Sequence, residues 1–253
     1  MMRFGFSDRF APRQNGNSIS CFAILTAGGV GSRVGSDIPK QFIHVYDKPV
    51  IAYTMEAFQR HPNVTGIAVA CLAGWEQVVE AYAKAYGINK LVGIITGGRT
   101  NQESIRKGLG VLEGVADTDD LIIIHDGNRA LVSQDVISSA ISVAVREGSA
   151  VTAIPCTEVI ARRDAGDETL CHETIRRESL ARTQTPHVMR LGELLALHER
   201  AESDGVDSAA LPELMVRYGM DVHLTPGDEM NFKITTPSDL EIFRALVEQE
   251  GRR

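Results

Sequence analysis

The sequence of 253 residues predicts an α/β domain built on a doubly wound, mostly parallel sheet. From residue 21 to residue 154, apolar runs of strand length alternate with segments of helical periodicity, a pattern typical of parallel sheets covered by helices. The run Leu121–Ile124 shows no polar alternation, as expected where helices cover both faces of a strand. Residues 1–20 are polar and lack an apolar signal core, so we expect a flexible extension before a single domain at 21–253.

The alternating part of the chain is expected to hold five strands and four helices. The strands are predicted at residues 21–25, 64–70, 91–96, 121–124 and 150–154. The helices, where apolar side chains recur every three or four positions, are predicted at residues 49–60, 75–86, 101–112 and 133–146. Turns rich in glycine or aspartate follow three of the strands, and functional residues should therefore gather beyond the carboxyl ends of the sheet.

The alternation stops between residues 155 and 182. Short apolar stretches at 159–161 and 169–171 flank the turn cluster Asp164–Asp167, which predicts a β-hairpin. A lone two-stranded ribbon is marginal in water, so we expect 155–182 to form a projecting dimerisation arm that a partner subunit buries. Further on, the sequence predicts helices at 191–203 and 207–218, a strand at 221–225, and a last helix opened by Thr236, Pro237 and Asp239.

Composition and charge argue against several classes of function. The 26 Lys and Arg against 33 Asp and Glu give a net charge of −7, and an acidic protein is a poor general binder of nucleic acid. No apolar run approaches the ~18 residues of a membrane span, and we expect a cytoplasmic protein. The four cysteines show no C-x-x-C spacing and indicate neither a zinc site nor a disulfide framework.

A glycine-rich loop follows the first predicted strand. It reads Ala-Gly-Gly-Val-Gly-Ser-Arg at residues 27–33 and continues to Pro39-Lys40-Gln41. Its glycines can expose backbone N–H groups to an anion, and Arg33 and Lys40 add positive charge. The loop fits neither a Walker loop nor a dinucleotide fingerprint, whose third glycine would fall at Val34. It predicts a polyphosphate site, with an ordinary strand-to-helix turn as the alternative.

Five motifs follow one another between residues 27 and 240: AGGVGSRVGSDIPKQF, GG-x-x-x-x-ES at 97–104, HDGNR, QTP at 184–186, and NFKITTPSDL. In this order they resemble the cytidylyltransferases that make CDP-activated polyols, over about residues 21–247. That family joins 2-C-methyl-D-erythritol 4-phosphate cytidylyltransferase with ribitol-5-phosphate cytidylyltransferase. The resemblance implies an enzyme that moves CMP from CTP to the phosphate of a sugar alcohol phosphate and releases pyrophosphate.

The resemblance also implies a role for each matching residue. The CTP site would comprise Ala27, Gly28, Gly29, Gly31, Gly97, Gly98, Ser104, Asp126 and Gly127. The catalytic cations would be Arg33, Lys40 and Lys233, and Asp126 would bind the cofactor Mg²⁺. The acceptor would be bound by Arg129, Arg177, Thr185 and Lys233. In the family's homodimer, the residues matching Arg177 and Thr185 reach across from the other subunit, which would give the hairpin arm the task of completing its neighbour's site.

The chain departs from the family pattern mainly on the acceptor side. Ala130 stands where the family has proline, and Asn101 stands where an arginine is common, although Arg99 could substitute for its charge. Glu158-Val159 replaces the Asp-Thr of the methylerythritol enzymes, and residues 206–209 read Val-Asp-Ser-Ala instead of Thr-Asp-Asp-Ala. These changes favour D-ribitol 5-phosphate or a similar pentitol phosphate as acceptor, with 2-C-methyl-D-erythritol 4-phosphate as the alternative.

Two other classes of function stay open at this level. A nucleotide-binding oxidoreductase would bind NAD(P) and ignore CTP, and the misplaced third glycine argues against it. A non-catalytic relative would bind CTP without releasing pyrophosphate, and the joint presence of Arg33, Lys40, Asp126 and Lys233 argues against that. His125 is expected to be structural, because a phosphate monoester is already largely ionised near neutral pH and needs no general base.

Overall fold

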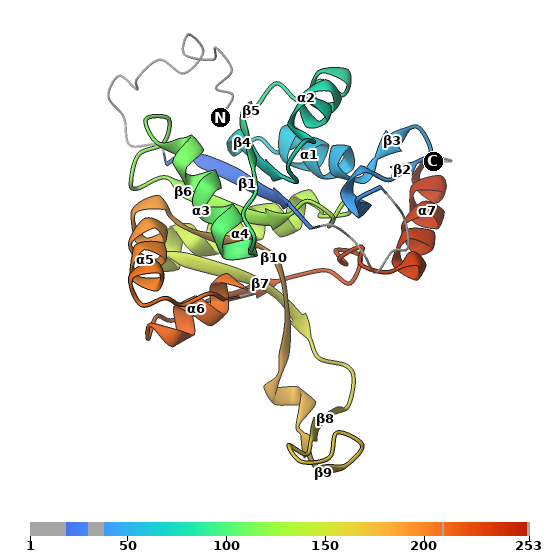
Figure 1. Cartoon of the computed structure of the whole chain (residues 1–253), viewed down its shortest axis with the longest axis vertical. Coiled ribbons are helices and arrows are strands. Elements are labelled where there is room, and N and C mark those ends of the chain that lie inside the picture. Colours follow the sequence, from blue (N-terminus) through green and yellow to red (C-terminus); the bar gives the residue numbers. More distant parts are fainter. Residues whose placement is uncertain (1–18, 30–37, 209, 252–253) are drawn as a thin grey trace.

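The computed structural model describes residues 19–29, 38–208 and 210–251. Within them, the centre is a seven-stranded sheet with the order β11-β7-β10-β6-β1-β4-β5 (Figure 1). Six strands share one direction: β1 (Cys21–Ala27), β4 (Val64–Cys71), β5 (Leu91–Thr96), β6 (Leu121–Asp126), β7 (Ser149–Pro155) and β11 (Leu224–Pro226). Of the seven, β10 (Ala181–Arg190) alone runs antiparallel, between β6 and β7. The predicted mostly parallel α/β sheet is confirmed.

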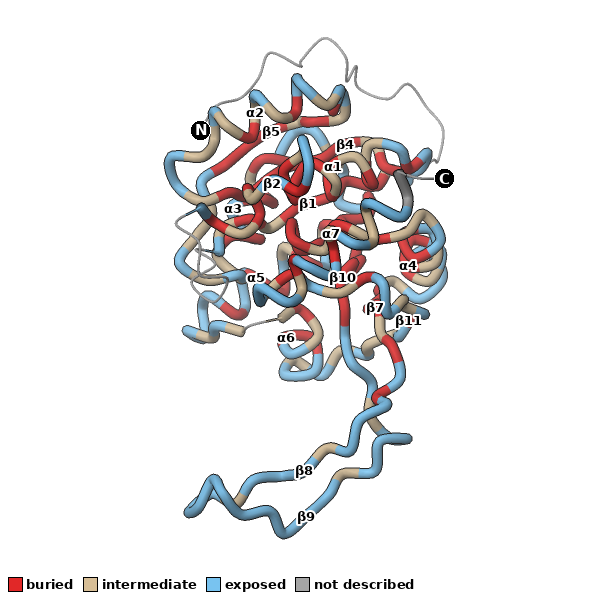
Figure 2. Tube along the Cα trace, turned by 90° about the vertical axis from the view of Figure 1, so that its right-hand side faces the viewer, coloured by how far each residue is buried: buried red, intermediate tan, exposed pale blue. Residues whose placement is uncertain are grey.

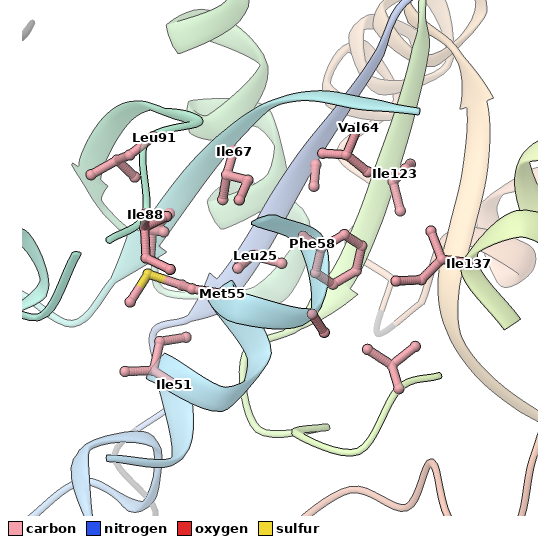
Figure 3. Packing of buried hydrophobic residues seen from close by; sticks show 14 of the residues in the cluster. Leu25, Ile51, Met55, Phe58, Val64, Ile67, Ile88, Leu91, Ile123 and Ile137 are labelled. Carbon is pink, nitrogen blue, oxygen red and sulfur yellow. The ribbon is translucent and has the colours of Figure 1, made fainter. Parts of the chain in front are cut away.

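Helices cover both faces of the sheet, because successive side chains of a strand point to opposite faces. One layer holds α1 (Val50–Arg60), α2 (Glu76–Ala85) and α4 (Gln134–Glu147). The other layer holds α3 (Asn101–Leu112), α5 (Leu191–Ser203) and α6 (Leu211–Arg217). Leu25 of β1 faces Met55 and Phe58 of α1 in the first layer (Figure 3), whereas its neighbour Ile24 packs in the second. The doubly wound prediction therefore holds.

A further apolar cluster fixes the C-terminal helix α7 (Pro237–Gly251). Phe243 and Leu240 of α7 pack with Val50, Ala130 and Ile234. The short elements η2 (Lys40–Phe42), β2 (His44–Val45) and β3 (Lys48–Pro49) lead into α1 beside this cluster. The segment before α7 is thereby docked beside the turn that follows β6.

The sequence-based prediction omits β10 and the two-residue strands β2 and β3, and many of its boundaries differ from the observed ones by a few residues. The first half of β10 is polar, with Thr183 and Gln184, and Pro186 interrupts it, so it lacks the apolar signature of a central strand. β11 covers Leu224–Pro226 instead of the expected 221–225, and α6 begins at Leu211, one residue before Pro212.

An arm projects from the sheet between β7 and β10 (Figures 1 and 2). Its strands β8 (Ile160–Arg163) and β9 (Cys171–Ile175) pair antiparallel and lie mostly exposed. Val159 at its base exposes 74% of its surface. The hairpin falls inside the expected segment 155–182, and its role in dimerisation stays a prediction.

Two further expectations concern the N-terminal extension and the cellular location of the protein. The expected extension at 1–20 lies almost wholly outside the described residues. Among the helices of the described part, none combines the length and apolar character that crossing a membrane requires. The cytoplasmic location stays a prediction.

Two glycines of α3 provide a matched test of the packing of this helix on β1. A Cβ at Gly108 would lie 2.6 Å from Ile24 Cγ2, whereas a Cβ at Gly110 would meet nothing within 4 Å. Gly110→Ala should raise the free energy of unfolding by about 0.5–1 kcal/mol, because alanine is the better helix former. Gly108→Ala should lower it by about 1 kcal/mol, because overpacking the core outweighs that gain. Chemical denaturation measures both, and stabilisation by both variants would contradict the close approach of α3 to β1.

Candidate active site

A cavity of about 370 Å³ opens beyond the carboxyl ends of the parallel strands. Ala27 at the end of β1 lines it together with Gly28 and Gly29 of the following loop, and β6 contributes Asp126. Because β10 runs antiparallel, its first half lies at this same edge and adds residues 183–185. Parallel α/β sheets commonly bind ligands at this edge.

Asp126 carries a buried negative charge on the wall of this cavity. Its Oδ1 accepts a hydrogen bond from Lys233 Nζ at 2.8 Å, and its Oδ2 accepts one from Arg129 Nε at 2.9 Å. Burial raises the pKa of the Asp126 carboxyl, but the charges and hydrogen bonds of Lys233 and Arg129 outweigh burial and hold that pKa well below its usual range. Asp126 is therefore ionised at neutral pH.

The turn after β6 is held by its neighbours on both sides. The N–H of Asp126 donates to Thr185 Oγ1 at 3.0 Å, and the N–H of Gly127 donates to Thr26 O at 2.8 Å. Thr54 Oγ1 of α1 donates to Gly127 O at 2.9 Å. A Cβ at Gly127 would lie 2.8 Å from Ile51 Cδ1, so this position has no room for a side chain.

Gln41 holds the glycine loop from the side of η2. Its Nε2 donates to Ala27 O at 2.6 Å and to Gly29 O at 3.0 Å, and the side chain is buried. The next residue, Phe42, stacks on Trp75 with ring centroids 4.1 Å apart. Lys40, which lines the cavity, therefore extends from a short helix fixed on both sides.

The start of α3 forms another wall. Ser104 Oγ accepts a hydrogen bond from Gly98 N and donates one to Thr100 O, both at 2.9 Å. Thr100 caps α3 by accepting from Glu103 N at 3.1 Å. A Cβ at Gly97 would lie 3.7 Å from the Cα of Gly28, so the loops after β5 and β1 pack closely together.

The structure brings most of the predicted site residues together. The described wall of the cavity includes the predicted residues Ala27, Gly28, Gly29, Lys40, Gly98, Ser104, Asp126, Arg129, Thr185 and Lys233. Gly97 and Gly127 are instead packing positions beside that wall. Gly31 and Arg33 lie outside the described residues.

Arg177 and Thr185, which were expected to contact the acceptor together, lie in different parts of the chain. Arg177 lies on the arm with 54% of its side chain exposed, and its Nη1 donates to Thr157 O at 3.2 Å. Thr185 is buried in the cavity of its own chain, where it accepts the hydrogen bond from Asp126 N. The expectation that Thr185 reaches across to another subunit is therefore wrong, because β10 places it at its own sheet edge.

Several residues of the site were missed by reasoning from the sequence. Asn128, Gln184 and His187 line the cavity, and Asn231 lies fully buried beside it. Burial lowers the pKa of His187 to about 4, so this ring is neutral at pH 7. Asn128, Gln184 and Asn231 lie within the HDGNR, QTP and NFKITTPSDL motifs, which was the available signal.

His125 is a buried structural residue, as expected. Its ring packs against Phe58 with centroids 5.0 Å apart, and its Nε2 lies 3.2 Å from Arg129 O. Burial lowers its pKa to about 4, which leaves the imidazole uncharged at neutral pH.

Comparison with known proteins identifies the family. A sequence profile of the 2-C-methyl-D-erythritol 4-phosphate cytidylyltransferase (IspD) family matches residues 21–249. The chain belongs to this family. It is 37% identical over 231 residues to ribitol-5-phosphate cytidylyltransferase of Lacticaseibacillus paracasei, covering 90% of this chain and 98% of that protein. It is 36% identical over 240 residues to 2-C-methyl-D-erythritol 4-phosphate cytidylyltransferase of Geobacter metallireducens, covering 92% and 99%.

Solved structures of the IspD family share the fold. The 2-C-methyl-D-erythritol 4-phosphate cytidylyltransferase of Thermus thermophilus matches with a TM-score of 0.72 and 25% identity, over 91% of this chain and 100% of that chain. The 4-diphosphocytidyl-2C-methyl-D-erythritol synthase of Anaerococcus prevotii matches with a TM-score of 0.78 over 91% of this chain and 99% of that chain, at 21% identity. The predicted enzyme class, a cytidylyltransferase with a Rossmann-like fold, is confirmed.

Proposed function

We propose that this cytidylyltransferase transfers CMP from CTP to the phosphate of D-ribitol 5-phosphate or a similar pentitol phosphate. The observation that carries the proposal is the cavity beside the glycine loop, which Lys40, Arg129 and Lys233 line together with Asp126. The second candidate acceptor is 2-C-methyl-D-erythritol 4-phosphate, because relatives of the two names are 37% and 36% identical to this chain. Val159, an apolar residue where methylerythritol enzymes carry threonine, favours the pentitol.

The chemistry requires positioning and positive charge more than proton transfer. An oxygen of the acceptor phosphate attacks the α-phosphorus of CTP in line, one P–O bond forms, another breaks, and pyrophosphate leaves. Both reactants are anions, so bringing them together and stabilising charge at the five-coordinate phosphorus dominate the barrier. Lys40 and Lys233 would supply that stabilisation from fixed positions on the cavity wall.

Arg129 is suited to hold the acceptor phosphate. Its Nε donates to Asp126 and its Nη1 donates to Asn231 O at 2.7 Å, so the plane of the guanidinium is fixed. The remaining N–H groups of this fork match the geometry of a phosphate.

Mg²⁺ is the proposed cofactor, held by Asp126 together with the phosphates of CTP. In the described part of the chain, no cluster of three or more His, Cys, Asp or Glu side chains could hold a metal by itself. A single carboxylate fits Mg²⁺, which commonly binds through one or two carboxylates plus substrate phosphates. When bound, the ion would neutralise charge on the triphosphate.

A homodimer completes the proposal, with Arg177 of each arm serving the cavity of the other subunit. The arm extends away from its own sheet, and its strands β8 and β9 are mostly exposed (Figure 2). A two-stranded ribbon gains little stability alone, which supports burial against a second copy.

The acceptor is tested by incubating the protein with CTP, Mg²⁺ and either ribitol 5-phosphate or methylerythritol phosphate. Pyrophosphate should be released, and a CDP-polyol should form, at a higher rate with ribitol 5-phosphate than with methylerythritol phosphate. Lys40→Ala should lower the rate about 100-fold or more, as the loss of one positioned charge typically does. Lys84→Ala, which removes an exposed lysine of α2 paired with Glu80, should leave the rate unchanged. CTP binding without turnover of either acceptor would contradict the proposal.

Subunit mixing tests the arm. Arg177→Ala and Lys40→Ala homodimers should each be nearly inactive. Mixed dimers contain one intact site, made of the cavity of the Arg177→Ala chain and the arm of the Lys40→Ala chain. After equal mixing and exchange, about a quarter of wild-type activity should return, because half of the dimers are mixed and half of their sites are intact. No recovery, with mixed dimers verified by mass spectrometry, would show that Arg177 does not act across subunits.

A further inference from the structure

Lys233 lies in a segment that has no regular secondary structure to hold it. Residues 231–235, between β11 and α7, form neither helix nor strand. The Lys233 side chain is 41% exposed, so packing restrains it only in part. Packing of Ile234 against Phe243 holds one side of this segment, and hydrogen bonds to its backbone further restrict where the ammonium lies.

Asn128 makes two such bonds to the residue next to Lys233. The N–H of Ile234 donates to Asn128 O at 3.0 Å, and Asn128 Nδ2 donates to Ile234 O at 2.5 Å. Both backbone groups of Ile234 are therefore held by a single residue. Asn128 itself is buried in the turn between Asp126 and Arg129. Its two hydrogen bonds to Ile234 therefore connect the segment 231–235 to the turn that carries the ion pair of the site.

A second anchor holds the other side of Lys233. Arg129 Nη1 donates to Asn231 O at 2.7 Å, and Asn231 Nδ2 donates to Thr185 O at 2.8 Å. Lys233 thus lies between two fixed points, and its Nζ meets Asp126 Oδ1 at 2.8 Å.

We propose that Asn128 is a positioning residue for Lys233, acting through the hydrogen bond from its carboxamide to Ile234 O. The bond from Ile234 N–H to Asn128 O joins two backbone groups, so a substitution at residue 128 leaves both groups in place. The bond from Asn128 Nδ2 is the one that a substitution removes. A shift of about 1 Å at a charged group that acts on a reacting phosphate can cost about 100-fold in rate. Expressed as free energy, the loss in reaction rate should therefore be larger than the loss in folding stability that removing one hydrogen bond causes.

The proposal rests on the proposed function for its kinetic readout, and a double-mutant cycle tests it. Asn128→Ala should lower kcat/KM for the acceptor about 10- to 100-fold in the wild-type background. In the Lys233→Ala background, the same substitution should change kcat/KM less than about 3-fold, because the group that Asn128 positions is gone. The low rates of these variants are measured with radiolabelled CTP. Equal losses in both backgrounds would overturn the proposal, since Asn128 would then act independently of Lys233.

Gln134→Ala is the matched control for lost stability. Gln134 Nε2 donates to Ala57 O at 2.9 Å, the same kind of amide-to-carbonyl bond, at the start of α4. It should change the melting temperature comparably to Asn128→Ala and leave kcat/KM unchanged. If Asn128→Ala does not fold, the near-isosteric and uncharged Asn128→Leu replaces it in the cycle. This variant fills a similar volume but has no donor for Ile234 O, and the same fold-changes are expected.

A readout without substrate separates this proposal from the choice of acceptor. Amide hydrogen exchange over residues 231–235 should accelerate in Asn128→Ala relative to wild type and Gln134→Ala, while exchange in the sheet stays unchanged. Unchanged exchange in residues 231–235 would contradict the claim that the Asn128 side chain restrains this segment. The cycle is run with whichever of the two acceptors the wild type turns over, so failure of ribitol 5-phosphate alone contradicts only the proposed acceptor.

Discussion

The ion pairs of Asp126 with Arg129 and Lys233 are the interaction on which the rest of the site depends. A carboxylate at the end of a buried strand is costly unless cations and hydrogen bonds compensate it. Here Lys233, 107 residues further along the chain, supplies one of those cations, so satisfying the charge also closes the C-terminal segment over the sheet edge. The same requirement draws Arg129 into a fixed orientation. Folding and preparation of the site are thus one event, because the groups that neutralise Asp126 are those that line the cavity.

The topology of the sheet decides what surrounds this charge. Six strands with a common direction bring their carboxyl ends to one edge, where the loop after β1 meets the turn after β6. The reversed strand β10 then delivers Thr185 to that edge from its amino-terminal half, and the Thr185 hydroxyl accepts the bond from Asp126 N. Without the reversal, the polar start of β10 would lie at the opposite edge. The apolar cluster of Ile234 with Phe243 completes the frame by holding the segment before α7.

Much of this fold follows from local sequence patterns, and what escapes prediction has identifiable causes. Apolar runs predict five of the seven strands, because burial on both faces imposes them, and a sixth is predicted at 221–225 near the short edge strand β11. Pro186 and its polar neighbours conceal β10. Motif matching selects Asp126, Lys233 and three glycines, Gly28, Gly29 and Gly98, that line the cavity, but it cannot assign a residue to a subunit, which is why the expectation for Thr185 is wrong. The supporting residues Asn128, Gln184 and Asn231 act through side-chain bonds to distant backbone atoms, and such contacts leave no periodic signal.

The central claim is that the Asp126 charge organises a CTP site, and calorimetric titration of CTP tests it most directly. Wild type and Asp126→Asn are each titrated with and without Mg²⁺. With Mg²⁺, wild type should gain affinity and the variant should gain much less. Equal affinities and equal responses to Mg²⁺ in the two proteins would contradict the claim.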